Sequence, residues 1–130
     1  MTDSPPTGRP LVLVAEDEES VRSMLGMVLR VAGFDALLCT DGLDAAERLE
    51  SGVQVDAVLI DVRMPRLGGI ELVERLRRRP ELARLPVIAM SAYNDEVQER
   101  AARAAGADAF LPKPFTIADL SRTLREVLDR

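Results

Sequence analysis

The stretch LVLVAE, residues 11–16, places five apolar residues directly before an acid. A short apolar run bounded by polar residues is typical of a strand that is buried on both faces of a sheet. Four later runs have the same form: FDALLC (34–39), DAVLID (56–61), PVIAMS (86–91) and DAFLPK (108–113). The sequence therefore predicts five buried strands, separated by segments long enough for helices.

The segments between these runs have the spacing of amphipathic helices. Apolar residues recur three and four positions apart in two of them, at Val21, Met24, Leu25, Val28 and Leu29 and again at Ile117, Leu120, Leu124, Val127 and Leu128. We expect each helix to bury this apolar stripe. Gly33, Gly52 and Gly106 follow expected helices where a left-handed cap is favoured, and Thr116 with Asp119 resembles a capping box.

Apolar strands that alternate with helices predict a parallel sheet covered on both faces, because right-handed crossovers place the helices against the sheet. We therefore expect an α/β fold, a doubly wound, flavodoxin-like five-stranded sheet in the order 2-1-3-4-5. Such sheets carry their functional sites at the carboxyl ends of the strands.

Composition and charge indicate how the chain is organised into domains and which partners to expect. The chain has 130 residues, of which 47% are hydrophobic and 30% charged, as is usual for one globular domain. We expect a flexible, proline-rich tail at residues 1–9 and one domain over residues 10–130. The net charge of -5 argues against direct binding to nucleic acid or to a membrane surface.

Cysteine and arginine content give two smaller expectations. Cys39 is the only cysteine, and no apolar leader or membrane-length segment is evident, so we expect a cytoplasmic location and a buried, unreactive thiol. The run RLRRRPELAR, residues 75–84, is rich in arginine without interleaved aromatics. We interpret it as a solvated helix end, with a docking patch as the alternative.

Polar residues stand where the expected strands end: Glu16, Asp17, Asp61, Ser91 and Lys113. Parallel strands bring these ends to one edge of the sheet. Two like charges about 4 Å apart repel by roughly 4 kcal/mol at an effective dielectric near 20, so three carboxylates suit a hard divalent cation. Oxygen ligands favour Mg²⁺, with Mn²⁺ as an alternative. The lysine is the only one in the chain, and its narrow point charge differs from the broad arginine fork.

Each of these residues also has a simpler interpretation. Glu16 and Asp17, like the acids that follow them, could complement the dipole of the first helix. Asp61 could be a surface acid, Ser91 could cap a turn, and Lys113 could extend from the sheet edge into water. Their common position at one edge favours a shared site.

Four motifs carry a resemblance to a known family. They are VAEDEESVR (14–22), DAVLIDVRMPRLGGIEL (56–72), VIAMSAY (87–93) and GADAFLPKPF (106–115). In this order and spacing, the chain from about Leu11 to Arg130 resembles response-regulator receiver domains of two-component signalling. No effector segment follows the last expected helix in this sequence, so we expect the single-domain type, with an excised N-terminal domain of a longer protein as the alternative.

The resemblance implies a role for each site residue. Asp61 would be the phosphoacceptor, and Glu16, Asp17 and Asp61 would bind Mg²⁺ together with the backbone carbonyl of Arg63. Ser91 and Lys113 would stabilise the phosphoryl group. Further roles implied are switching for Ser91 and Phe110, tuning of dephosphorylation for Arg63 and Tyr93, and a cis Lys113–Pro114 peptide bond. Plain packing in the core is the alternative for Phe110.

The function implied is that of a phosphorylation-controlled switch rather than an enzyme with a separate substrate. A sensor histidine kinase or histidine phosphotransfer protein would donate the phosphoryl group to Asp61, forming an aspartyl phosphate. The chain has no histidine and would be the recipient. Output would come from protein docking on the face of the fourth helix, fifth strand and fifth helix, as a monomer or a phosphorylation-dependent dimer.

The chain departs from the common family pattern at three positions, and three alternative classes of protein are compared with it. Ser91 stands where threonine is frequent, Phe110 where tyrosine is frequent, and Gly68 where aspartate is frequent. A haloacid-dehalogenase-like phosphatase needs a second aspartate where this chain has Arg63. A flavodoxin-like nucleotide binder needs a glycine-containing phosphate loop after the first strand, whereas the residues after the first apolar run here, EDEES (16–20), are acidic and contain no glycine. A receiver-like docking module that works without phosphorylation is the remaining alternative.

Overall fold

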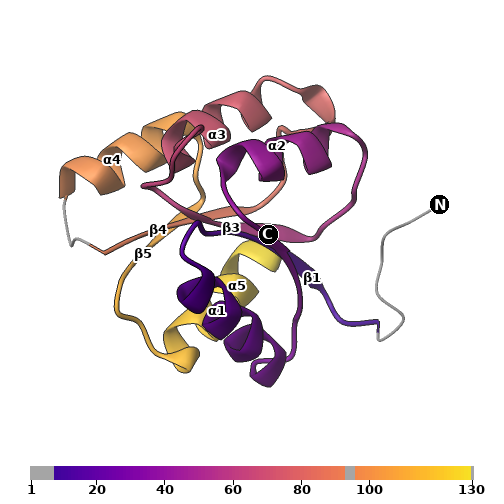
Figure 1. Cartoon of the computed structure of the whole chain (residues 1–130), viewed down its shortest axis with the longest axis vertical. Helices are drawn as coiled ribbons and strands as arrows, with labels where there is room; N and C mark the ends of the chain where they lie inside the picture. Colours follow the sequence, from indigo (N-terminus) through magenta and orange to yellow (C-terminus); the bar gives the residue numbers. More distant parts are fainter. Residues whose placement is uncertain (1–7, 93–95, 130) are drawn as a thin grey trace.

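The computed structural model describes residues 8–92 and 96–129. Its strands are β1 (Leu11–Ala15), β2 (Asp35–Cys39), β3 (Ala57–Asp61), β4 (Val87–Ser91) and β5 (Ala109–Pro112). Its helices are α1 (Glu19–Val31), α2 (Gly42–Glu50), α3 (Gly69–Arg77), the short 3-10 helix η1 (Pro80–Leu82), α4 (Glu96–Ala105) and α5 (Ile117–Leu128) (Figure 1). Strand and helix alternate along the chain, as the sequence predicts.

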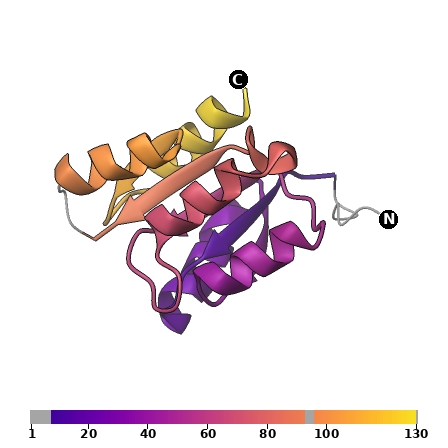
Figure 2. The same cartoon turned by 90° about the horizontal axis from the view of Figure 1, so that it is seen from above.

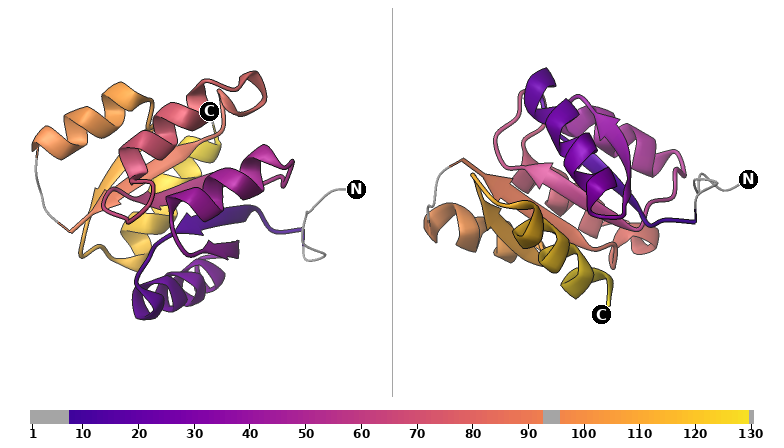
Figure 3. Two further views of the ribbon diagram at one scale, coloured as in Figure 1. Left: turned by 45° about the horizontal axis from the view of Figure 1, so that its top comes forward. Right: turned by 90° about the horizontal axis from the view of Figure 1, so that it is seen from below.

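The five strands form one parallel sheet in the order β2-β1-β3-β4-β5. This confirms the fold class and the strand order. Helices α2, α3 and α4 cover one face of the sheet, which Figure 2 shows from above. Helices α1 and α5 cover the opposite face, seen from below in the right-hand view of Figure 3. The order reverses between β1 and β3, and the carboxyl ends of these two strands therefore lie at the switch point of the sheet.

The sheet separates two apolar cores. Alternate residues of the central strands point to opposite faces, so Leu13 packs toward α2 and α3, while Val14 packs toward α1 and α5. All residues of β1, β3 and β4 are buried. This explains why these strands have continuous apolar runs instead of an alternating pattern.

Two residues of the predicted helix stripes lie in solvent. Met24 is 53% exposed and Ile117 is 45% exposed, so the expectation that they are buried is wrong. Met24 lies about 100° around the helix from Leu25, which points into the core. Ile117 is the first residue of α5, ahead of the turn where Leu120 becomes buried. Spacing alone does not locate the edge of the buried face.

The helix-end signals are confirmed. Gly33, Gly52 and Gly106 all have φ values between +100° and +120°. Thr116 accepts a hydrogen bond from the backbone N–H of Asp119, whose carboxylate accepts one from the backbone N–H of Thr116. The Lys113–Pro114 peptide bond is cis, as expected.

One residue of the basic run at residues 75–84 departs from the interpretation of this run as a solvated helix end, whereas Arg78 and Arg84 are exposed as expected. Arg77 turns inward and donates hydrogen bonds to the carbonyls of Gly106, Leu82 and Leu85. It also pairs with Asp108 at 3.1 Å. Arg77 thus connects the end of α3 to the start of β5 and to the segment before β4. The spacing of the run could not show this, because the partners of Arg77 are three backbone carbonyls and one carboxylate that lie outside α3.

Within the described part of the chain, no helix combines the length and apolar character that a bilayer crossing requires.

Cys39 is buried at the end of β2, as expected. Burial, and next the nearby Asp44 carboxylate, raise the pKa of the Cys39 thiol from 9.0 to about 12. The native protein should therefore react with iodoacetamide at pH 8 about a thousandfold more slowly than the unfolded chain, because only the thiolate reacts. Mass spectrometry of timed samples with and without urea measures both rates. Equal rates would contradict a buried thiol.

A candidate acidic site at the carboxyl edge of the sheet

Three carboxylates from two neighbouring strands meet at one point. Asp61 is the last residue of β3, and Glu16 and Asp17 directly follow β1, which pairs with β3. One carboxylate oxygen from each residue lies within 4.8 Å of the other two. Glu16 and Asp61 are buried, whereas Asp17 is exposed. The predicted convergence of these acids is therefore confirmed, and Asp17 forms its solvent side.

Lys113 bridges the two buried carboxylates. Its Nζ donates to Glu16 Oε1 at 2.8 Å and to Asp61 Oδ2 at 3.1 Å. Lys113 follows β5, which is separated from β3 by β4, and its backbone N–H bonds the Ser91 carbonyl at 2.7 Å. The long, thin lysine stem spans this distance and brings a compact charge between two acids, a position that suits a guanidinium fork poorly.

The same contacts set the charge state of Lys113. Burial alone would lower the pKa of its ammonium, but the hydrogen bonds to Glu16 and Asp61 outweigh burial and raise the pKa above its ordinary value of 10.5. Lys113 is therefore fully charged at neutral pH. It neutralises one of the three negative charges, and the site keeps a formal charge of about -2.

Backbone and arginine donors hold the acids in place. Glu16 Oε2 accepts from the backbone N–H of Glu18 at 3.1 Å, and Asp61 Oδ1 accepts from that of Arg63 at 3.2 Å. Arg22 Nη1 donates to the backbone carbonyls of Glu16 at 2.9 Å and Asp17 at 3.3 Å. Sequence reasoning missed Arg22, although it closes the first motif, one helical turn beyond the start of α1.

The donor set fits a hard divalent cation. All three converging ligands are carboxylates, the oxygen ligands that Mg²⁺ prefers, and the single ammonium leaves negative charge uncompensated. Asp17 makes the site accessible from solvent. The carbonyl of Arg63 as a further ligand stays a prediction; the residue itself is exposed in the loop after β3.

The remaining predicted residues have different surroundings. Ser91 is buried at the end of β4, beside the strand that carries Asp61. Phe110 is buried in the core under α3 and α4, the environment expected of a packing residue, and its switching role stays a prediction. Tyr93 lies outside the described residues.

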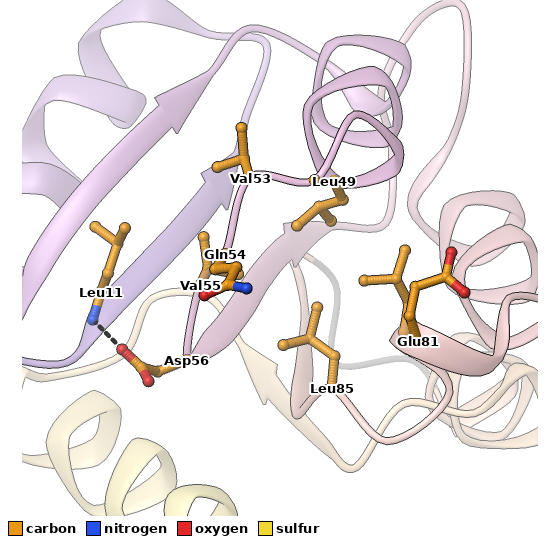
Figure 4. Close-up of a pocket in the computed structure, with 10 residues that line it drawn as sticks. Leu11, Leu49, Val53, Gln54, Val55, Asp56, Glu81 and Leu85 are labelled. Atoms are coloured by element: carbon orange, nitrogen blue, oxygen red, sulfur yellow. Dashed lines mark hydrogen bonds between the residues drawn. The ribbon is translucent and has the colours of Figure 1, made fainter. Parts of the chain in front are cut away.

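A cavity of about 400 Å³ lies at the opposite end of the sheet. Its wall combines the starts of β1 and β3 with the segments around η1, and Figure 4 shows Leu11, Asp56 and Leu85 among its residues. Asp56 Oδ2 accepts a hydrogen bond from the backbone N–H of Leu11 at 2.7 Å. This hydrogen bond joins the residue before β3 to the first residue of β1. Among the described residues, the two acids that line the cavity, Asp56 and Glu81, belong to no cluster of three possible metal ligands.

Fold and site together define a doubly wound α/β domain with a lysine-bridged acidic cluster at its switch point. The sequence model described as the response regulator receiver domain matches residues 12–125. The chain therefore belongs to the response-regulator receiver domain family. This family membership argues against the alternatives of a haloacid-dehalogenase-like phosphatase and a flavodoxin-like nucleotide binder.

Curated relatives agree with this assignment. The chain is 36% identical over 121 residues to the phosphate regulon transcriptional regulatory protein PhoB of Rhizobium meliloti, a match that covers 93% of the chain and 53% of the relative. It is 39% identical over 120 residues to the response regulator MprA of Mycobacterium ulcerans, covering 92% and 50%. The chain thus spans about half the length of these relatives.

Solved structures agree as well. A putative response regulator from Chloroflexus aurantiacus superposes with a TM-score of 0.89 at 30% identity, covering 94% of this chain and 99% of that one. The receiver domain of a sensor histidine kinase from Pseudomonas aeruginosa superposes with a TM-score of 0.86 at 28% identity, covering 95% and 100%. That structure is described as holding a magnesium ion coordinated in its active-site cleft.

Proposed function

We propose that this chain is a phosphoacceptor switch that receives a phosphoryl group on Asp61 from a phosphohistidine of a partner protein. The observation that carries the proposal is the convergence of Glu16, Asp17 and Asp61 around the Lys113 ammonium. In the transfer, an Asp61 carboxylate oxygen forms the new bond to phosphorus while the bond from phosphorus to the histidine nitrogen breaks. The nitrogen keeps the electron pair and is protonated.

A bound Mg²⁺ would neutralise charge on the phosphoryl oxygens, and Glu16, Asp17 and Asp61 would hold it. The P. aeruginosa relative, with its coordinated magnesium ion, supports this assignment. Lys113 would exchange its contact with Asp61 for one with the phosphoryl group, since its Nζ already lies 3.1 Å from the reacting carboxylate. Ser91, on the next strand, would hydrogen-bond the same group.

Family membership supports a histidine kinase or a histidine phosphotransfer protein as the partner. Helix α1 begins two residues after Asp17 and carries an exposed apolar stripe of Met24, Met27 and Val31. We place the donor against this stripe, because a protein bound there reaches the acidic edge. We also propose that the protein acts in the cytoplasm.

In this proposal, the switch signals by the docking of a downstream protein. Helices α4 and α5 flank β5, and each exposes a large apolar residue, Val97 at 63% and Ile117 at 45%. Phosphorylation would change this face through Ser91 and Phe110. Driving a switch from 1:99 to 99:1 requires about 5.5 kcal/mol, more than one hydrogen bond supplies, so Lys113 and the cation must contribute too.

The test of the proposal is intact-mass spectrometry after incubation with acetyl phosphate, a small-molecule phosphodonor. We expect a gain of about 80 Da, the mass of one phosphoryl group, that requires Mg²⁺ and is prevented by EDTA. Absence of the gain at every Mg²⁺ concentration would instead favour a docking module that works without phosphorylation.

Metal binding can be measured separately by titration calorimetry of the unphosphorylated protein. Asp17→Asn should weaken Mg²⁺ binding by about tenfold or more, because one of three anionic ligands is lost. Glu19→Gln is the matched control, since Glu19 is a neighbouring exposed acid outside the cluster. Equal losses in the two variants would indicate a general charge effect and contradict a ligand role for Asp17.

A further inference from the structure

The loop between β3 and α3, residues 62–68, contains an unusual backbone conformation. Arg66 has φ = 68°, and among the described residues it is the only non-glycine with a positive φ. The backbone N–H of Leu67 donates to the carbonyl of Pro65 at 2.7 Å, so Arg66 is the central residue of a three-residue turn. A positive φ at the centre of such a γ-turn is rare and strained for a residue with a side chain. An arginine there implies a compensating contact.

The contact is a two-point ion pair with Asp41, 25 residues earlier in the chain. Arg66 Nε donates to Asp41 Oδ2 at 2.8 Å, and Nη2 donates to Oδ1 at 3.2 Å. Paired arginine–carboxylate bonds of this kind fix direction as well as distance. Burial on its own would raise the pKa of Asp41, but hydrogen bonds from Arg66 and the Asp44 backbone hold that pKa below its ordinary value.

Asp41 is itself firmly held. It is the N-cap of α2, its Oδ1 accepts from the backbone N–H of Asp44 at 2.8 Å, and its side chain is only 10% exposed. The Arg66 side chain is 56% exposed. Asp41 is therefore the rigid partner, and it determines where the tip of the loop lies.

Backbone contacts secure the rest of the loop. A side chain at Gly42 would overlap the carbonyl oxygen of Leu67, so the loop rests directly on the start of α2. At its base, the backbone N–H of Gly69 donates to the carbonyl of Val62 at 2.9 Å. The loop is thus held at its base by a backbone hydrogen bond and at its tip by the Asp41–Arg66 pair.

We propose that the Asp41–Arg66 pair positions the loop after Asp61 for cation binding. Arg63 lies in this loop, three residues before Arg66, and its carbonyl is the predicted further ligand. Arg66 acts through the backbone and is a positioning residue. A ligand held in place before the cation arrives loses little freedom on binding, which raises affinity. The inference rests on the proposed function, because it assumes a cation held at Glu16, Asp17 and Asp61.

Arg66→Gly is the most informative variant. Glycine adopts the positive φ without strain, so the turn can form while the ion pair is lost. We expect Mg²⁺ affinity, measured by calorimetry on the unphosphorylated protein, to fall by about three- to tenfold. Asp41→Asn, which keeps a capping side chain, should have a similar effect, and the double variant should be little worse than either single one.

Phosphorylation by acetyl phosphate gives a second readout. In Arg66→Gly, the Mg²⁺ concentration for the half-maximal rate should rise by the same factor, while the rate at saturating Mg²⁺ should stay unchanged. A general loss of stability would not produce this separation, because it would also lower the rate at saturation.

Arg75→Ala is the matched control. Arg75 forms the same kind of two-point pair with Glu50, at 2.8 and 2.6 Å, and joins α3 to the far end of α2. Its loss should leave Mg²⁺ affinity unchanged. Wild-type affinity in Arg66→Gly would overturn the positioning role and leave the proposed function intact. A wild-type protein that binds no Mg²⁺ would overturn both.

Discussion

Asp61→Asn is expected to abolish phosphorylation, with no gain of mass under conditions in which the wild type gains about 80 Da. The amide has almost the same shape as the carboxylate and can keep one of its two hydrogen bonds, because its oxygen can accept from Lys113 Nζ or from the backbone N–H of Arg63, whereas its NH2 group cannot accept. It lacks the anionic oxygen that must bond to phosphorus, and it removes one anionic ligand from the cluster. The loss should be complete, because the other described carboxylate that contacts Lys113 Nζ, that of Glu16, is less accessible to a phosphodonor: its side chain is 2% exposed, against 13% for Asp61.

Asp56→Asn is the control for this experiment. Asp56 immediately precedes β3, at the opposite end from Asp61, and bonds the Leu11 backbone. Asp56→Asn makes the same chemical change just before the start of the strand that ends at Asp61, and phosphorylation of this variant should match that of the wild type. A full mass gain in Asp61→Asn, or a loss in both variants, would contradict Asp61 as the acceptor. Peptide mapping would then locate the modified residue.

Lys113→Met is expected to destabilise the metal-free protein by about 2–3 kcal/mol. The variant keeps a long side chain but leaves Glu16 and Asp61, both buried, without their shared cation. Removing one partner of a buried ion pair costs more than the pair contributes, because the remaining charges are neither solvated nor paired. Urea unfolding in EDTA measures the change, and saturating Mg²⁺ should restore part of the loss.

The difference in the free energy of unfolding between the wild type and Lys113→Met should depend on pH in a definite direction. The pKa of Lys113 is raised in the folded protein. Its contribution to the free energy of unfolding is therefore fully present below the ordinary value of 10.5 and is lost as the pH rises through the higher folded value. The difference between wild type and Lys113→Met should stay constant from neutral pH to about pH 9 and shrink above pH 10.5. Cys39 titrates in both proteins and cancels.

A variant with the opposite expected effect on stability tests the electrostatic explanation. Asp17→Asn removes repulsion from the metal-free cluster, so it should slightly stabilise the protein in EDTA, by less than about 1 kcal/mol because Asp17 is exposed. Opposite shifts for Lys113→Met and Asp17→Asn would show that net charge governs the stability of this site. Unchanged stability in Lys113→Met would mean that the ion pairs contribute nothing to folding.

The amino-acid sequence by itself determined the fold and the edge at which the site lies. Continuous apolar runs such as those of β1 and β3 predict buried parallel strands, and parallel strands align their carboxyl ends. The sequence therefore predicts that Glu16, Asp17 and Asp61 meet, and the structure brings one carboxylate oxygen from each of them within 4.8 Å of the others. These inferences succeed because they depend on local periodicity and on a general rule of sheet topology.

Only the tertiary structure decided which partners the long side chains reach. Arg77 turns inward to Gly106, Arg66 pairs with Asp41, and Lys113 contacts Glu16 as well as Asp61. These choices depend on the path of loops and on several rotatable bonds, neither of which leaves a periodic signal in the sequence. Periodicity indicates which face of an element is buried. The distances between elements determine which charges meet.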